Sequence, residues 1–249
     1  MFQFFVEDHQ IGETQIWIAG EDVNHMRHVL RMKPGTQLRI SNRQGQDYFC
    51  ELEYFSGNSR EGETAFARIL YKDRESTELP AKIVLFQGLP KGDKMEWVIQ
   101  KAVELGAYEI VPVAMRNCVV KLAGAKADAK IKRWQAIAQS AAKQAKRSII
   151  PNVHAVMDFA DAVGYAQTMD IRLVPYENET GMTYTKEVMK NIGDAALIGV
   201  FIGPEGGFDK QEIKLVQETA HLLSLGKRIL RTETAGLTML SILLYHLED

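Results

Sequence analysis

The segment Gly203-Pro204-Glu205-Gly206-Gly207-Phe208 combines three glycines with one carboxylate at a point where a strand is expected to end. It follows the apolar run 197–202, and Asp209 and Glu212 after it have the spacing of a capping box at a helix start. In open α/β sheets, ligands bind outside the carboxyl ends of the strands, and glycines let a ligand approach the main chain. Because Glu205 would repel a phosphate, the segment favours a ligand that lacks phosphate and carries positive charge. A tight turn without a ligand is the alternative.

A second segment, 223–236, has the same order of strand, loop and helix. Arg231 and Glu233 flank Thr232, which is predicted to be the N-cap of a closing helix. Two such loops at one edge of a sheet would form opposite walls of a single pocket. The alternative for Arg231 and Glu233 is a surface ion pair beside a capped helix, worth about 0–1 kcal/mol.

Basic residues are concentrated in two tracts, although the whole chain has a formal charge of −2. Residues 24–46 hold five Arg or Lys and no acid, and residues 116–147 hold nine against Asp128 alone. Tracts of one sign indicate a polyanionic partner such as nucleic acid, because a solvated surface usually mixes its signs. A basic helix kept for solubility is the alternative.

Several other kinds of chemistry find no support in the 249 residues. The motifs HExxH, GxSxG, GxGxxG and the P-loop are missing, which argues against metal hydrolysis, a serine nucleophile and a phosphate-binding loop. Cys50 and Cys118 form no CxxC pair, which suits a reducing cytoplasm. The longest apolar stretch, 195–202, is shorter than the roughly 20 residues of a membrane span, and the N-terminus does not resemble a signal peptide. We therefore expect a cytoplasmic protein without a membrane span or a metal.

The hydrophobic pattern changes near residue 72, which predicts two domains. Residues 1–72 contain short alternating runs with tight turns, typical of a small β-barrel, and one helix that buries Val23, Met26 and Leu30. Residues 73–80 are polar and predict a linker, whereas in 81–249 compact apolar runs alternate with helices, as in a parallel sheet covered on both faces. The expected strands are 15–18, 37–40, 48–52, 65–70, 83–86, 110–113, 171–174, 197–202 and 222–225. The best-marked helices are one that begins with a capping box at Asp93 and Glu96 and stops before Gly106, and one over 210–220.

Three motifs together resemble the bacterial 16S ribosomal RNA uridine-N3 methyltransferases, the RsmE family of the SPOUT superfamily. They are Leu-Pro-Lys-Gly-Asp-Lys-Met-Glu at 89–96 with Glu-Leu-Gly at 104–106, the glycine segment at 203–208, and Leu-Gly-Lys-Arg-Ile-Leu-Arg-Thr-Glu-Thr-Ala at 225–235. The run His-Met-Arg-His-Val-Leu-Arg at 25–31, followed by Gly35, fits the same family, so the resemblance spans essentially the whole chain.

The resemblance implies a PUA-like RNA-binding barrel, then a SPOUT α/β methyltransferase domain with a C-terminal trefoil knot, in a homodimer whose active sites are completed by the partner subunit. It implies S-adenosylmethionine as the cofactor, held by Gly203, Glu205, Gly206, Leu225, Gly226, Ile229, Leu230 and Ala235. Arg116 matches an arginine of the family, and Gln144 and Arg147 match its Gln…Arg pair. The chain departs from the family pattern at Met115-Arg116-Asn117, where Glu-Arg-Ser is usual, and at Lys143, where a glutamate is usual.

The reaction implied is methyl transfer from S-adenosylmethionine to N3 of a specific uridine in the decoding region of 16S rRNA, giving 3-methyluridine. The candidate catalytic residues are Arg116 and Arg231, which would stabilise charge on a uracil carbonyl oxygen, and Glu233 as a candidate base. The expected RNA-binding residues are Arg27, Arg31, Lys132, Lys143, Gln144, Lys146 and Arg147, with 16S rRNA in the 30S subunit as the partner. The alternatives are a SPOUT 2′-O-ribose methyltransferase acting on another RNA and a non-catalytic RNA-binding assembly factor.

Overall fold

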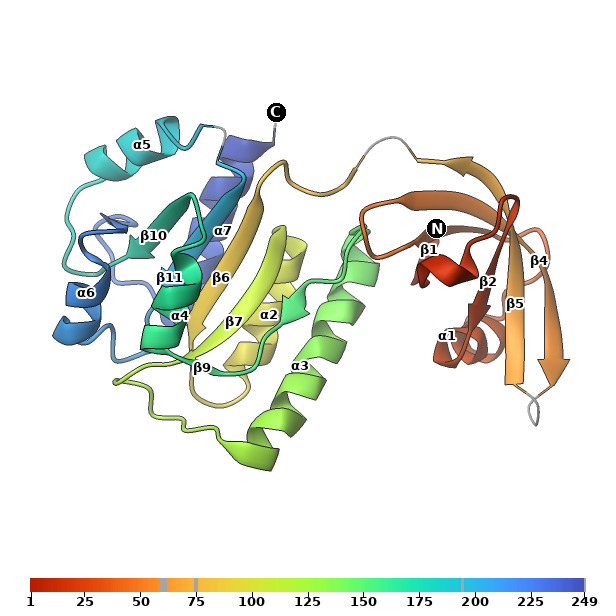
Figure 1. Cartoon of the computed structure of the whole chain (residues 1–249), viewed down its shortest axis with the longest axis horizontal. Helices are drawn as coiled ribbons and strands as arrows, with labels where there is room; N and C mark the ends of the chain where they lie inside the picture. The colour runs from red at the N-terminus through yellow and green to blue at the C-terminus, as the bar shows by residue number, and fades with distance from the viewer. Residues whose placement is uncertain (59–61, 74–75, 194, 249) are drawn as a thin grey trace. The chain divides into compact units, whose positions relative to one another are not determined.

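The computed structural model describes residues 1–58, 62–73, 76–193 and 195–248, and the chain divides into two compact units (Figure 1). The first unit comprises Met1–Glu78 and Ala142–Ile150, and the second comprises Leu79–Ala141 and Pro151–Asp249. The first unit therefore takes in a late segment of the chain. Arg74 and Glu75 of the predicted linker 73–80 lie outside the described residues.

The first 72 residues form strands and helical turns, and the two longest strands have 12 and 11 residues. They are β1 (Phe2–Phe5), η1 (Asp8–Gln10), β2 (Gln15–Ala19), α1 (Glu21–Asn24), η2 (His25–Val29), β3 (Gln37–Ser41), β4 (Asp47–Asn58) and β5 (Gly62–Lys72). From residue 82 onward, strands and helices alternate. The elements are β6 (Lys82–Gly88), α2 (Lys94–Glu104), β7 (Ala107–Ala114), α3 (Gly124–Ala145), β8 (Asn152–Val153), β9 (Met157–Asp158), α4 (Phe159–Ala166), β10 (Ile171–Pro175), α5 (Thr183–Lys190), β11 (Leu197–Ile202), α6 (Lys210–Val216), β12 (His221–Leu223) and α7 (Thr232–Leu247).

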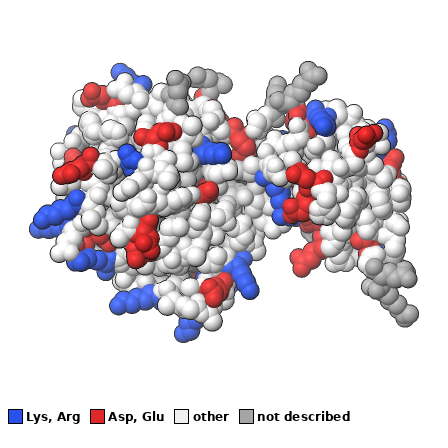
Figure 2. All heavy atoms as spheres, viewed as in Figure 1, with Lys and Arg blue, Asp and Glu red and all other residues white. Residues whose placement is uncertain are grey.

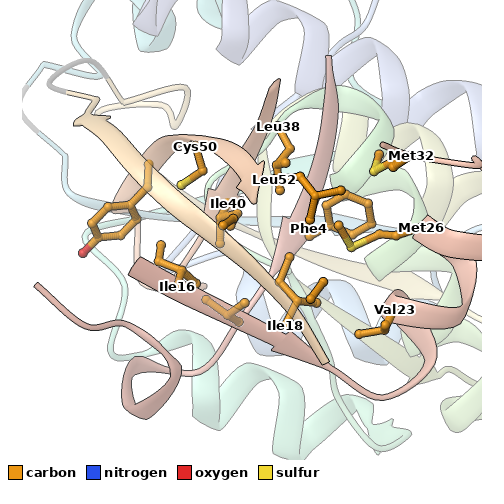
Figure 3. Packing of buried hydrophobic residues seen from close by; sticks show 14 residues of the cluster. Phe4, Ile16, Ile18, Val23, Met26, Met32, Leu38, Ile40, Cys50 and Leu52 are labelled. Carbon is orange, nitrogen blue, oxygen red and sulfur yellow. The ribbon is translucent and has the colours of Figure 1, made fainter. Parts of the chain in front are cut away.

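The five strands described in the first unit form one curled sheet in the order β1-β3-β4-β5-β2. β1 and β3 are parallel, and the other neighbours are antiparallel. The sheet curls around apolar side chains that include Phe4, Ile16, Leu38 and Leu52 (Figure 3). Because β1 and β2 are its two ends, the sheet is a half-barrel. The predicted helix forms as α1 and η2, and it buries Val23 and Met26.

The sequence pattern does not predict β1, and its side chains explain why. A half-buried strand alternates polar and apolar residues, but Gln3 is buried together with its neighbours Phe4 and Phe5. The Gln3 side-chain amide donates a hydrogen bond to the Arg147 carbonyl oxygen at 2.5 Å. A polar residue that is buried with a distant partner leaves no periodic signal.

The seven strands described in the second unit form a sheet in which every pairing is parallel, in the order β12-β10-β11-β6-β7-β8, with β9 also on β7. Helices α4 and α6 lie on one face of this sheet, and α2 and α7 lie on the other (Figure 1). Residues 83–86 of β6 are therefore all fully buried, which accounts for their unbroken apolar run. The predicted α/β fold class is confirmed, and the carboxyl ends of all these strands meet at one edge.

Predicted helix starts agree with the structure at α6 and differ at α2. At α6, Asp209 accepts a bond from the Gln211 N–H at 2.9 Å, and Glu212 accepts one from the Asp209 N–H at 2.8 Å, although the helix ends at Val216 instead of residue 220. At α2, the predicted capping box at Asp93 and Glu96 does not form.

Cations from α3 explain the missing capping box at α2. Lys130 lies 3.4 Å from Asp93 and 3.5 Å from Glu96, and Arg133 lies 2.8 Å from Glu96. These contacts hold the two carboxylates against α3. The end of α2 agrees with the prediction, because the helix stops before Gly106, which has a φ of +90°.

The last predicted strand ends early, at Leu223, because its partner β10 ends at Pro175.

Glu109 on β7 accepts two hydrogen bonds from distant segments, at 2.8 Å from His154 Nε2 and at 2.7 Å from the Tyr165 hydroxyl. The bond to His154 lowers the pKa of Glu109 below its ordinary 4.5, against the opposing effect of burial. Burial and the bond to Glu109 raise the pKa of Tyr165 to about 12, so its hydroxyl remains a donor. This cluster joins β7, the segment after β8 and α4.

Glu109→Gln is expected to lower the free energy of unfolding at pH 7 by about 1–3 kcal/mol, because an amide replaces a charged acceptor of two bonds. A carboxyl group whose pKa is lower in the folded than in the unfolded state stabilises the folded state when the pH is above the unfolded-state pKa. This stabilisation is lost as the pH falls through the folded-state pKa. The difference from wild type should therefore narrow below pH 4.5. Urea titrations between pH 3 and 7 measure this difference in free energy. Glu104→Gln is the control, because Glu104 pairs at 2.8 Å with Lys101 on the same helix instead of joining distant segments. A difference that is constant with pH would contradict the role of the charge.

Candidate active site

Three loops follow the carboxyl ends of β10, β11 and β12, which are neighbours in the sheet. Residues 175–177 with 179–181, residues 202–208 and residues 224–232 line a common cavity of about 740 Å³. This volume is in the range of small-molecule sites, and its place at the carboxyl edge of a parallel sheet is the usual one for ligands.

All eight residues that the sequence predicts to hold the cofactor line this one cavity. They are Gly203, Glu205, Gly206, Leu225, Gly226, Ile229, Leu230 and Ala235. Three of them are glycines, and a Cβ on Gly226, whose φ is +112°, would meet no atom within 4 Å. A ligand in the cavity can therefore approach the main chain at Gly226.

Thr232 joins the two loops by its hydroxyl, which corrects its predicted role as a helix N-cap. The N-cap of α7 is Arg231, and Thr232 is already helical. The Thr232 hydroxyl donates to the Gly203 carbonyl oxygen at 2.6 Å and accepts from Gln87 Nε2 at 2.8 Å. The hydroxyl is thus engaged with β6 and the loop after β11, and is not available to cap its own helix.

Lys94 at the start of α2 also lines the cavity, and it bridges two of the predicted carboxylates. Its ammonium lies 3.0 Å from Glu205 and 3.4 Å from Glu233, so the alternative ion pair between Arg231 and Glu233 is replaced by one with Lys94. Burial alone would raise the pKa of Glu205, but the bonds from the Lys91 N–H and from Lys94 lower it below its ordinary value. Glu205 is therefore an ionised group with a partner.

Two further carboxylates of the cavity, Glu177 and Glu179, come from the loop after β10, and the sequence analysis assigns them no role. The signal for them is their position directly after the predicted strand 171–174. Unlike Glu205, neither has an ion-pair partner among the described residues. Lys227, Arg228 and Arg231 line the same cavity, so its wall carries charges of both signs.

The candidate catalytic residues are divided between the cavity and the loop after β7. Arg231 lines the cavity, and Glu233 lies beside it against Lys94. Arg116 does not line the cavity; its side chain is 59% exposed, and its guanidinium lies 3.6 Å from Asp209. The next residue, Asn117, donates to the carbonyl oxygens of Gly206 and Gly207, so the Arg116 segment touches the cavity wall from outside.

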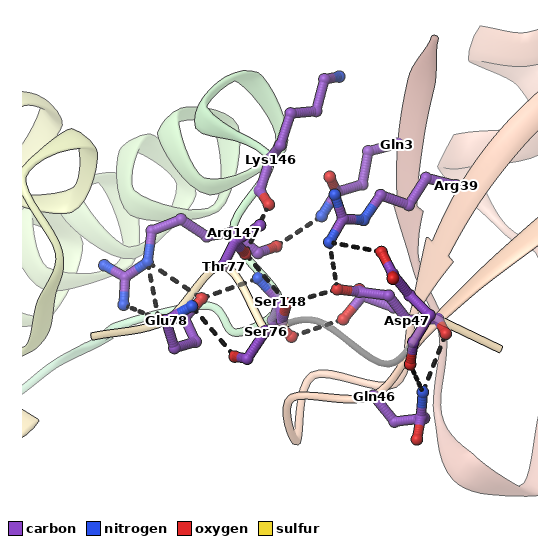
Figure 4. Close-up of polar contacts among 12 residues, drawn as sticks. Gln3, Arg39, Gln46, Asp47, Ser76, Thr77, Glu78, Lys146, Arg147 and Ser148 are labelled. Carbon is purple, nitrogen blue, oxygen red and sulfur yellow. Dashed lines mark hydrogen bonds and ion pairs between the residues drawn. The ribbon is translucent and has the colours of Figure 1, made fainter. Parts of the chain in front are cut away.

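Several of the predicted RNA-binding residues in the first unit are held by acidic side chains. Arg27 lies 2.9 Å from Glu63, and Lys143 lies 2.6 Å from Asp22. Arg147 is only 4% exposed and donates to Glu78, within a polar cluster that also contains Asp47 and Ser148 (Figure 4).

Other members of the predicted RNA-binding set remain accessible. Arg31, Lys132 and Gln144 are exposed, and Lys146 is half-buried with its ammonium on the Met1 carbonyl oxygen at 2.8 Å. On the visible face in Figure 2, acidic and basic side chains are interspersed. The basic tracts of the sequence are therefore partly neutralised by acids from elsewhere in the chain.

Membrane-spanning helices and clusters of metal ligands are both absent from the described residues. Among the helices described, none has the length and apolarity that a membrane crossing requires. Within the same residues, no three His, Cys, Asp or Glu side chains are grouped so that they could hold a metal ion.

The comparisons with known proteins agree with this geometry. Residues 77–244 match the family described as RNA methyltransferase domain, and residues 18–59 match that described as RNA methyltransferase PUA domain. A ribosomal RNA small subunit methyltransferase E of Bacillus subtilis (strain 168) is 35% identical over 255 residues, covering 100% of this chain and 98% of that protein. The chain belongs to the ribosomal RNA small subunit methyltransferase E family.

Two solved structures similar to this chain contain the predicted cofactor. A ribosomal RNA small subunit methyltransferase E from Neisseria gonorrhoeae, bound to S-adenosyl methionine, is 28% identical with a TM-score of 0.82, over 97% of this chain and 95% of that chain. A putative methyltransferase from Legionella pneumophila, in complex with the same cofactor, is 30% identical with a TM-score of 0.82, over 98% and 97%. The predicted class of enzyme, an S-adenosylmethionine-dependent rRNA methyltransferase with a PUA domain, is confirmed at the level of the family.

Proposed function

We propose that this enzyme transfers the methyl group of S-adenosylmethionine to N3 of a uridine in 16S rRNA, giving 3-methyluridine. The observation that carries the proposal is the convergence of all eight residues expected at the cofactor on one cavity. Bound there, S-adenosylmethionine supplies an electrophilic methyl group on a sulfonium. Glu177 and Glu179 form no ion pair among the described residues and can stabilise such a cation, within a wall that also carries Lys227, Arg228 and Arg231. The open space at Gly226 suits a ligand against the main chain.

The protein residues have three tasks in this reaction. They hold the uracil in line with the methyl group, stabilise negative charge on O2 or O4, and accept the N3 proton. Alignment is the largest contribution, worth about 7–11 kcal/mol for well-oriented reactants. We assign charge stabilisation to Arg116 or Arg231, and Glu233 is the candidate proton acceptor because it is a carboxylate beside the cavity.

The N3 atom is on the Watson–Crick edge, so the target uridine must be unpaired or drawn out of its helix. The accessible members of the predicted RNA-binding set, Arg31, Lys132, Gln144 and Lys146, are proposed to hold the surrounding phosphates. Arg27 and Lys143 would first have to leave their acidic partners. Arg147 is not proposed as a phosphate ligand, because its guanidinium is buried with Glu78.

Lys132→Gln is expected to weaken RNA binding and to reduce the slope of log affinity against log salt by about 1, because one phosphate contact is lost. Lys132 has no ion-pair partner within the described part of the chain. Filter binding to 30S particles at several salt concentrations measures the slope. Lys101→Gln is the control, since Lys101 already pairs with Glu104 at 2.8 Å. An unchanged slope in Lys132→Gln would show that this lysine is merely solvated.

We also propose that the enzyme is a homodimer that uses an apolar groove of the second unit. The groove has a volume of about 560 Å³ and is lined by α7, α5 and Trp97 of α2. Trp97 and Tyr245 are 45% and 79% exposed, which is unusual for large hydrophobic side chains.

Leu237→Asp, in this groove, is expected to shift the protein from dimer to monomer, because an unpaired charge would be buried in the interface. Sedimentation velocity measures the change. Leu215→Asp, on α6, is the matched control because Leu215 is exposed and lies outside the groove. A Leu237→Asp protein that remains dimeric would place the interface elsewhere.

Analysis of methylated nucleosides tests the reaction itself. The purified enzyme is incubated with S-adenosylmethionine and with either 30S particles or naked 16S rRNA from a strain that lacks the enzyme, and the digested RNA is examined by mass spectrometry. Appearance of 3-methyluridine supports the proposal, and the preferred substrate identifies the partner. A 2′-O-methyl nucleoside would support the alternative methyltransferase, and RNA binding without any transfer would support an assembly factor.

A further inference from the structure

The segment that carries Arg116 and the glycine loop after β11 are joined by one buried carboxylate. The Glu212 side chain is 3% exposed. Its Oε1 accepts the Arg116 main-chain N–H at 2.8 Å, and its Oε2 accepts the Asp209 main-chain N–H at 2.8 Å. One side-chain carboxyl group thus fixes the main chain of both segments.

Asn117 makes a second connection between the same segments. Its Nδ2 donates to the carbonyl oxygens of Gly206 and Gly207, each at 3.1 Å. The approach is close, because a Cβ on Gly206 would lie 2.9 Å from the Asn117 Cβ. An amide has two N–H groups and can therefore donate to two carbonyl oxygens at once.

The loop reaches Asn117 by passing over the end of β6, which lies between β11 and β7 in the sheet. A Cβ on Gly88, the last residue of β6, would lie 2.7 Å from the Pro204 nitrogen. Gly88 of β6 therefore packs against the start of the loop at Pro204, and Asn117 and Glu212 bind its end at residues 206–209.

We propose that Glu212 and Asn117 are positioning residues that fix the main chain of Arg116 against the glycine loop, so that the guanidinium stays within reach of the uracil. This inference rests on the proposed function. The Arg116 side chain is itself 59% exposed, and among the described residues its one ion-pair contact is with Asp209 at 3.6 Å, so its placement depends on the main chain beneath it. A misplacement of about 1 Å can lower turnover roughly 100-fold.

A double-mutant cycle tests the proposal. Turnover is measured as labelled methyl transferred from S-adenosylmethionine to 30S particles, for wild type, Asn117→Asp, Arg116→Ala and the double variant. Asn117→Asp keeps the shape of the side chain but removes both donors, and we expect it to lower kcat at least 10-fold with a smaller change in KM for the cofactor. In the Arg116→Ala background, the same change should lower kcat less than 2-fold, because the group that it positions is gone.

Two further variants keep the test decisive if Asn117→Asp does not fold. Asn117→Ser, which retains one donor, and Glu212→Gln, which can accept only one of the two main-chain bonds, should both lower kcat about 3- to 10-fold and show the same dependence on Arg116. Equal losses in the presence and absence of Arg116 would overturn the proposal. Failure of the proposed function is distinguishable, because the wild-type enzyme would then transfer methyl to a different nucleoside or to none.

Discussion

Arg116→Ala is expected to lower kcat by about 100-fold or more, the loss seen when one donor to a developing oxyanion is removed. The dissociation constant for S-adenosylmethionine should change less than about 2-fold by the same reasoning, because Arg116 does not line the cavity and acts only as charge develops. Calorimetric titration with the cofactor and methyl-transfer assays on 30S particles measure the two quantities.

Arg133→Ala is the matched control for Arg116→Ala. Arg133 is also an exposed arginine of the second unit, and its partner, Glu96, lies on α2. This variant should keep both kcat and cofactor affinity near the wild-type values. If Arg116→Ala weakened cofactor binding as much as it lowered turnover, Arg116 would be a binding residue, and Arg231 would remain as the source of charge stabilisation.

Gly88→Ala is expected to weaken S-adenosylmethionine binding at least 10-fold, although Gly88 does not line the cavity. Its Cβ would lie 2.7 Å from the Pro204 nitrogen and 3.0 Å from the Ile202 carbonyl oxygen, and both neighbours are main chain. The start of the glycine loop would have to shift, and overpacking of this kind costs about 1–3 kcal/mol. Calorimetry below the melting temperature separates lost binding from lost folding.

Gly164→Ala provides the comparison for Gly88→Ala. Gly164 lies within α4, and a Cβ there would meet no atom within 4 Å. Alanine also has a higher helix propensity than glycine, so this variant should bind the cofactor normally and melt at the same temperature or slightly higher. Normal cofactor binding by Gly88→Ala would mean that the loop tolerates displacement from β6.

The cavity could be predicted from the sequence because its residues are local to strand ends. The order of a buried strand, a glycine loop and a capped helix is contained within residues 197–216, and the Asp209 and Glu212 capping box forms as expected. The roles of Thr232 and Lys94 could not be predicted, because each depends on partners from distant segments: Gly203 and Gln87 for Thr232, and Glu205 and Glu233 for Lys94.

Charge patterning could not predict which basic side chains are paired, for the same reason. The tract 116–147 has one acid of its own, but Lys130 and Arg133 contact Glu96, and Arg147 contacts Glu78. The charge of a sequence tract counts only residues that are close along the chain. An ion pair depends on distance in space, so its acid can come from a distant segment. A prediction of phosphate contacts therefore needs the fold, which distinguishes Lys132 from Arg147.

The polar cluster around Asp47 in the first unit has a consequence for biosynthesis. Asp47 and Gln3 are made early, but their partners Ser148 and Arg147 follow 101 and 144 residues later along the chain. A nascent chain that ends at residue 72 has all five strands of the half-barrel and lacks these partners. The half-barrel is thus completed only after residues 147 and 148 have been translated, long after its own five strands.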